Sequence, residues 1–92
     1  MFVLIHCYER DITLMGTYDT ISQARIAMHL DVLLAMDEAN RSDDWIAEVR
    51  DVVNGQQFND DFYYEDDEMA ILSDGAWANF HEEYYDWKIF KI

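Results

Sequence analysis

Residues 76–92 read AWANFHEEYYDWKIFKI, and apolar and polar side chains alternate along most of this stretch. Alternation with a period of two is typical of a β-strand that buries one face. The polar residues 81–83 interrupt the pattern and predict a connection between strands at 76–80 and 84–92. In the second strand one face carries Tyr85, Trp87 and Ile89, and the other carries Tyr84, Asp86, Lys88 and Phe90. These residues therefore predict an antiparallel hairpin.

Three further strands are predicted around this hairpin. One lies directly before it, at 68–73, because Ser73-Asp74-Gly75 is typical of a tight turn. Two lie at the opposite end of the chain, at 2–8 and 12–18, and the polar Glu9-Arg10-Asp11 between them predicts a second hairpin. Since residues 2–8 are apolar on both alternating faces, we expect that strand inside the sheet, with both faces at least partly covered.

A first helix is predicted from about residue 21 to residue 37, with Asp19 or Thr20 as its N-terminal cap. Its apolar residues occupy a broad arc, so we expect the helix to pack on the sheet along its full length. Arg25 and Asp31 are predicted to face water. The predicted buried arc comprises Ile21, Ala24, Ile26, Met28, Leu30, Val32, Leu33, Leu34 and Ala35.

A second helix is predicted to begin at Ser42, a good capping residue. Asp43 and Asp44 follow in the first turn, where negative charge complements the helix dipole. Asn54-Gly55 is predicted to end this helix, with a residue able to take a left-handed conformation. The predicted buried stripe comprises Trp45, Ile46, Val49, Val52 and Val53.

The predicted element order is β-β-α-α-β-β-β, which defines an α+β fold. We expect an antiparallel sheet of about five strands with the two helices packed on one face. A chain of 92 residues makes one domain, 1–92, and its 51% apolar content is enough for a real core.

The charge balance excludes several partners. With 20 acidic residues, 6 basic residues and a net charge of −14, the chain is not expected to bind nucleic acid directly or to approach an anionic membrane. No apolar run reaches the roughly 18 residues of a membrane span. Cys7 is a single cysteine, and residues 2–5 are too short for a signal peptide, so we predict a cytoplasmic protein, monomeric or homodimeric.

The uncompensated charge is concentrated in the second half of the chain, because no Lys or Arg occurs between Asp51 and Trp87. Like charges held close together repel, so their concentration here indicates a use, and a basic partner would supply one. The predicted partner-binding residues are Asp60, Asp61, Tyr63, Tyr64, Glu65, Asp66, Asp67, Glu68, Glu82, Glu83 and Asp86.

Such a surface can imitate nucleic acid. Carboxylates on one face of a strand recur about every 6.6 Å, a spacing similar to that of phosphates along one DNA strand. The alternative is a non-enzymatic assembly or scaffolding protein, whose acidic surface only provides solubility. In that interpretation the interface residues would be Trp45, Phe58, Phe62 and Trp77.

The sequence predicts no metal binding, no catalysis and no cofactor. The acidic run 65–68 does not match the spacing of a calcium loop and lacks its glycine. His6 and Cys7 are adjacent on a strand, which points them to opposite faces. His29 and His81 have no nucleophile motif beside them.

Two segments carry a resemblance to known proteins. The first leads from the opening hairpin into a helix through Gly16-Thr17-Tyr18-Asp19-Thr20, and the second combines Ala76-Trp77-Ala78-Asn79 with Tyr85-Asp86-Trp87-Lys88-Ile89. Over about the first 30 and last 20 positions, the chain resembles small acidic proteins of bacterial phages and mobile elements. The resemblance implies an inhibitor, most concretely an anti-CRISPR protein, that acts as a DNA mimic in the bacterial host cell. Its partner would be a basic nucleic-acid-binding protein such as a Cas effector.

Overall fold

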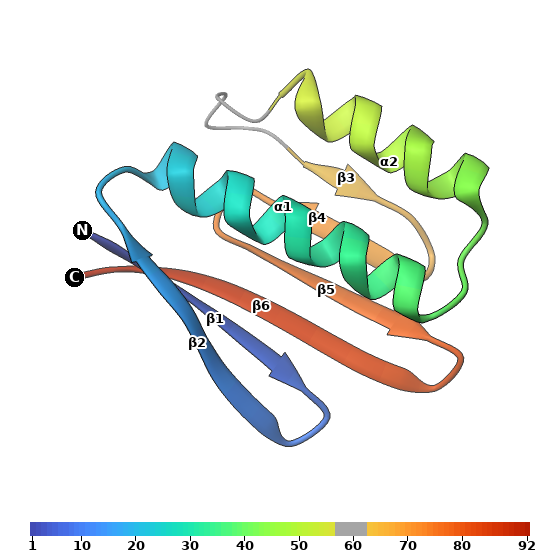
Figure 1. The fold of residues 1–92 in the computed structure, drawn as a ribbon, viewed down its shortest axis with the longest axis horizontal. Coiled ribbons are helices and arrows are strands. Elements are labelled where there is room, and N and C mark those ends of the chain that lie inside the picture. The colour runs from blue at the N-terminus through green and yellow to red at the C-terminus, as the bar shows by residue number, and fades with distance from the viewer. Residues whose placement is uncertain (57–62) are drawn as a thin grey trace.

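The computed structural model describes residues 1–56 and 63–92, which form two layers (Figure 1). The elements are β1 (Phe2–Tyr8), β2 (Asp11–Tyr18), α1 (Ile21–Glu38), α2 (Asp43–Asn54), β3 (Tyr64–Glu65), β4 (Met69–Leu72), β5 (Gly75–Phe80) and β6 (Glu83–Lys91). All strands join one antiparallel sheet in the order β2-β1-β6-β5-β4-β3, and both helices cover the same face. The predicted α+β class is confirmed. The sheet has six strands rather than about five, because β3 is an additional strand of two residues.

The first strand, β1, lies inside the sheet between β2 and β6, as predicted. Both of its faces are at least partly covered, as predicted, but the cover is unequal. Leu4 points toward the helices and is fully buried, whereas Val3 and Ile5 point to the other side and are only half-buried. The physical reason is that residues 39–42 make a short link between the helices, so both stay on one side of the sheet.

Of the two predicted N-terminal caps of helix α1, Asp19 and Thr20, the structure uses Thr20. The Thr20 hydroxyl accepts a hydrogen bond from the Gln23 backbone N–H at 3.2 Å, and the Gln23 side-chain oxygen accepts one from the Thr20 N–H at 3.3 Å. These reciprocal bonds form a capping box, which satisfies backbone donors that a helix leaves free at its start. The helix is therefore set by local sequence.

The predicted orientation of α1 is wrong at four positions, one of which is Leu34, expected in the core but 53% exposed. Arg25 is buried and its Nε donates to the Ser73 carbonyl at 2.6 Å, and Asp31 is half-buried against the sheet. Leu30, predicted to be in the core, is 62% exposed. Apolar residues surround this helix on every side, so periodicity alone does not identify the face that meets the sheet.

Helix α2 begins as predicted, since the Ser42 hydroxyl accepts a hydrogen bond from the Trp45 backbone N–H at 3.2 Å. It buries Val49 and Val53, but the prediction that Val52 is buried is wrong, because this side chain lies on the exposed side of the helix. The expected left-handed residue at its end is wrong, because Gly55 has a φ of −71°. The Gly55 N–H bonds to the Asp51 carbonyl, so the backbone continues its right-handed turn.

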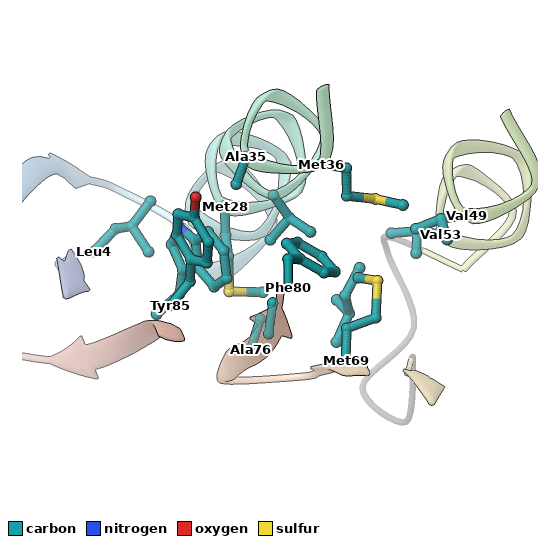
Figure 2. Packing of buried hydrophobic residues seen from close by; sticks show 14 of the residues in the cluster. Leu4, Met28, Ala35, Met36, Val49, Val53, Met69, Ala76, Phe80 and Tyr85 are labelled. Carbon is teal, nitrogen blue, oxygen red and sulfur yellow. The ribbon is translucent and has the colours of Figure 1, made fainter. Parts of the chain in front are cut away.

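The core lies between the two layers, where side chains of both helices meet those of the sheet (Figure 2). Trp87 and Phe80 are its largest fully buried residues. The predicted alternation of the last strand is confirmed, since Tyr85 is buried with Trp87 while Phe90 is exposed. Burial of an aromatic side chain contributes about 1.5–3 kcal/mol, so these residues are the main anchors of the sheet against α1.

Candidate functional site

The chain reverses direction at every connection, so alternate connections lie at the same end of the molecule (Figure 1). The links β1–β2, α1–α2, β3–β4 and β5–β6 all lie at the end away from the two termini. We call this the acidic end and define it as residues 9–11, 37–44, 66–68 and 81–83. It holds eleven of the 20 carboxylates: Glu9, Asp11, Asp37, Glu38, Asp43, Asp44, Asp66, Asp67, Glu68, Glu82 and Glu83.

Arg41 joins three of these connections. Its guanidinium donates to the Glu68 carboxylate at 2.9 Å, contacts the His81 ring and lies over the Phe80 ring at 5.7 Å from the centroid. Glu68 therefore has a basic partner, which corrects the view that nothing in the chain pairs with the acidic run. The two residues are 27 positions apart, so the pairing has no local signal in the sequence.

The tip of the first hairpin docks on β6. The Glu9 N–H donates to the Tyr84 carbonyl at 3.1 Å, and the Tyr84 N–H donates to the Glu9 carboxylate at 3.2 Å. The Tyr85 hydroxyl donates to Glu83 at 3.3 Å. Glu9 and Glu83, which are 74 positions apart in the chain, are thereby brought to one place.

Tyr8 and Tyr85 lie beside these carboxylates, and both burial and the neighbouring negative charges act on their hydroxyl groups. Their rings are 4.8 Å apart. Burial, then the charge of Glu83, raise the pKa of Tyr85 to about 12. Desolvation and the charges of Glu83, Glu9 and Glu38 also raise the pKa of Tyr8. A field that disfavours an additional anion favours a cation, so the acidic end is suited to a basic ligand.

Backbone strain concentrates in the same connections. Four non-glycine residues in the described parts of the chain have positive φ, and all four belong to the acidic end: Glu9, Asn40, His81 and Glu82. His81 and Glu82 form the two-residue turn of the β5–β6 hairpin, with φ of 52° and 73°. Glycine or asparagine normally occupies such positions, and other residues cost about 1–3 kcal/mol each. The turn thus carries a carboxylate at an energetic cost.

A depression of about 490 Å³ lies beside Arg41. It is lined by Asn40, Arg41, Ser42, Trp45, Asp66 and Glu68. Two carboxylates and an indole ring are partners that a Lys or Arg side chain prefers. The Trp45 indole N–H donates to the Tyr64 hydroxyl at 2.9 Å, which holds the ring in place.

The predicted partner-binding residues divide into four groups. Asp66, Asp67, Glu68, Glu82 and Glu83 meet at the acidic end. Tyr63 is exposed at the edge, while Tyr64 is half-buried and packs against the core. Glu65 and Asp86 point away from the helices, on the opposite face of the sheet. Asp60 and Asp61 lie outside the described residues, as do Phe58 and Phe62 of the alternative interface.

Six carboxylates of the acidic end come from the first half of the chain and were not predicted: Glu9, Asp11, Asp37, Glu38, Asp43 and Asp44. Neighbouring Arg10 and Arg41 concealed them, because a window along the sequence counts these positive charges together with the acids beside them. The available signal was the element order, since alternate connections of an up-and-down chain meet at one end.

No protein family, characterised protein or solved structure matches the chain. Within residues 1–56 and 63–92, no three His, Cys, Asp or Glu side chains form a group that could hold a metal ion. Neither helix of the described chain combines the length and the apolarity needed to cross a membrane.

Proposed function

We propose that the protein is a cytoplasmic inhibitor that binds a nucleic-acid-binding protein of a bacterial host and occupies the site where that protein holds phosphates. Its binding surface is the acidic end. The most concrete version is an anti-CRISPR protein that engages a Cas effector through the Arg and Lys side chains that normally grip guide or target. Such a protein needs charge and geometry and no catalytic residue.

The observation that supports this best is the convergence of eleven carboxylates from four connections on one end. Each connection is held by the fold: Glu9 is bonded to β6, and Glu68 is bonded to Arg41. A pre-ordered array loses little side-chain entropy on binding, so more of its electrostatic attraction remains as affinity. A surface that served only solubility would need no such ordering.

The test is inhibition of target-DNA cleavage by a panel of purified Cas effectors. The variant Asp11→Asn/Asp67→Asn/Glu82→Gln removes three charges from three connections, and within residues 1–56 and 63–92 none of these carboxylates takes part in a hydrogen bond or an ion pair. The matched control, Asp19→Asn/Glu48→Gln/Asp74→Asn, removes three exposed charges elsewhere. We expect the first variant to lose inhibition and the second to keep it.

Equal loss in both variants, or loss in neither, would contradict the proposed surface. In that case the acidic end is a solvated face and the scaffolding alternative is preferred. Trp77, one of the residues of that alternative, lies half-buried on the side of the sheet opposite the helices.

A further inference from the structure

The side of the sheet opposite the helices, which we call the open face, is apolar, and no helix or strand within residues 1–56 and 63–92 covers it. The Cα atoms span only 17 Å along the shortest axis, which accommodates one helix layer and one sheet layer. Large apolar side chains on the open face include Ile5, Ile12, Leu14, Leu72, Trp77 and Phe90. Ile12 and Leu14 are 73% and 63% exposed. Apolar surface of this extent on a strongly charged protein marks an interaction site.

The charge on this face identifies its partner. Its strands carry only three charged side chains, Glu65, Asp86 and Lys88, so the face has a net charge of about −1 against −14 for the whole chain. Lys88 has no ion-pair partner among the described residues. A basic partner would find little to attract it here. A second nearly neutral sheet with one positive and one negative group would fit.

We propose that the open face binds the open face of a second copy, forming a two-fold dimer whose paired strands run antiparallel. The two-fold axis would cross β6 between Asp86 and Lys88. Asp86 of each copy then faces Lys88 of the other. The two-fold symmetry makes this contact twice, so Asp86 and Lys88 of each copy are both paired.

The same axis makes the rest of the face self-complementary. On β6, it places Tyr84 opposite Phe90 of the second copy, an aromatic pair. On β5, it places Trp77 opposite Gly75, so the largest side chain of that strand meets a position without one.

The neighbouring strands follow the same register. Leu72 is placed opposite Ala70 on β4, and Ile12 opposite Leu14 on β2. The face also has a hollow of about 300 Å³ beside Cys7, which a second apolar layer would fill. Large groups thus meet small ones on β4 and β5, and apolar groups meet apolar ones on β2.

The area is sufficient. The six strands average six residues, so spacings of about 4.8 Å between strands and 3.3 Å between residues give a projected face of roughly 570 Å², and side-chain relief increases its accessible area. A stable interface needs about 800 Å² from each partner. Antiparallel packing also puts the two acidic ends at opposite ends of the dimer. Their separation of roughly 25 Å is about three Debye lengths at physiological salt, so repulsion between them is screened.

A charge exchange tests the dimer by sedimentation equilibrium. Asp86→Lys alone would set two Lys against each other at both contacts, and Lys88→Asp alone would set two Asp against each other. We expect each single variant to raise the dimer dissociation constant by about tenfold or more, because like charges in an interface repel. An equimolar mixture of the two variants should form a heterodimer, since each charge then faces its opposite.

Matched controls separate this effect from net charge. Asp74→Lys and Lys91→Asp make the same charge changes off the open face and should leave the dimer unchanged. Ile12→Lys/Phe90→Lys should abolish the dimer. Leu30→Lys/Leu34→Lys, which alters equally exposed leucines on α1, should not. Far-UV circular dichroism confirms that each variant is folded.

Three outcomes would overturn the inference. The chain could sediment as a monomer at all concentrations, the mixture of charge variants could remain monomeric, or the leucine variant could be the one that breaks the dimer. If the parent chain is monomeric and Ile12→Lys/Phe90→Lys loses binding to a Cas effector, the open face would instead be assigned to that partner. Inhibition by the acidic end is measured separately, so either proposal can fail without the other.

Discussion

The Trp87 indole N–H donates to the Asp31 carboxylate at 2.7 Å, which ties the middle of α1 to the central strand β6. The same carboxylate oxygen lies 3.1 Å from Nδ1 of His6, whose ring stacks on Trp87 at 5.0 Å between centroids. Asp31 therefore satisfies two donors on two neighbouring strands. Because apolar residues lie on every side of α1, these polar contacts of Asp31 help to specify which side of the helix meets the sheet.

We predict that Asp31→Leu lowers the free energy of unfolding by about 1–3 kcal/mol, because it leaves the buried Trp87 N–H without an acceptor. Asp31→Asn keeps an oxygen acceptor and should lose less. Urea denaturation of the two variants measures the difference. Equal stability of Asp31→Leu and the parent chain would show that the hydrogen bond makes no net contribution.

A second prediction compares the stability cost of truncating a core residue, Trp87, with that of truncating a residue on the exposed side of α1, Leu30. Trp87→Ala should cost about 3–5 kcal/mol, since the side chain is fully buried and its removal leaves a cavity. Leu30→Ala should cost less than about 1 kcal/mol, because this side chain is 62% exposed. Thermal or urea midpoints provide the comparison. Similar losses in both variants would mean that Leu30 is covered in solution.

The third prediction concerns alkaline pH. Tyr85 has a pKa of about 12 in the folded chain, above the ordinary value of about 10 that applies when the chain is unfolded. Because the unfolded chain releases this proton first, stability from the neutral tyrosine is complete below pH 10 and is lost between about pH 10 and 12. Tyr85→Phe should remove this part of the pH dependence of the unfolding free energy.

Spectrophotometric titration gives an independent reading of the same group. Glu83→Gln should lower the pKa of Tyr85, since it removes a neighbouring negative charge and replaces the charged acceptor of the hydroxyl with a neutral one. Asp74→Asn, at the other end of the molecule, is the control. An unchanged titration in Glu83→Gln would show that burial alone accounts for the shift.

The fourth prediction is salt dependence of the inhibitory complex. Exposed opposite charges are screened over about 8 Å at physiological ionic strength, so Kd for the partner should rise steeply with salt. The triple variant at the acidic end should show a shallower dependence, because fewer charge contacts remain. Titration calorimetry at several salt concentrations measures both. A Kd independent of salt would contradict the charge-driven interface. Separately, a gel shift with duplex DNA would contradict the expectation that the protein does not bind DNA directly.

Much of the fold could be predicted because its signals are local. Alternation in 84–92 placed Trp87 inside and Phe90 outside, and Thr20 and Ser42 began the two helices through hydrogen bonds within three residues. Periodicity and capping depend on neighbours in the chain, so a sequence displays them directly. The orientation of α1 had no such signal, because its apolar residues surround the helix.

The sequence by itself therefore determined five of the six strands, both helices, the one-sided alternation of β6 and the excess of negative charge. Only the tertiary structure decided where that charge gathers. The two-residue strand β3 adds one more reversal of the chain between α2 and β4. Without it, the turn at 81–83 would come one reversal earlier and would lie at the opposite end of the molecule from Glu9. Which connections share an end depends on counting every reversal and on which strands pair, and these are non-local properties. Contacts such as Arg41 with Glu68 follow from that count, so no short stretch of sequence can reveal them.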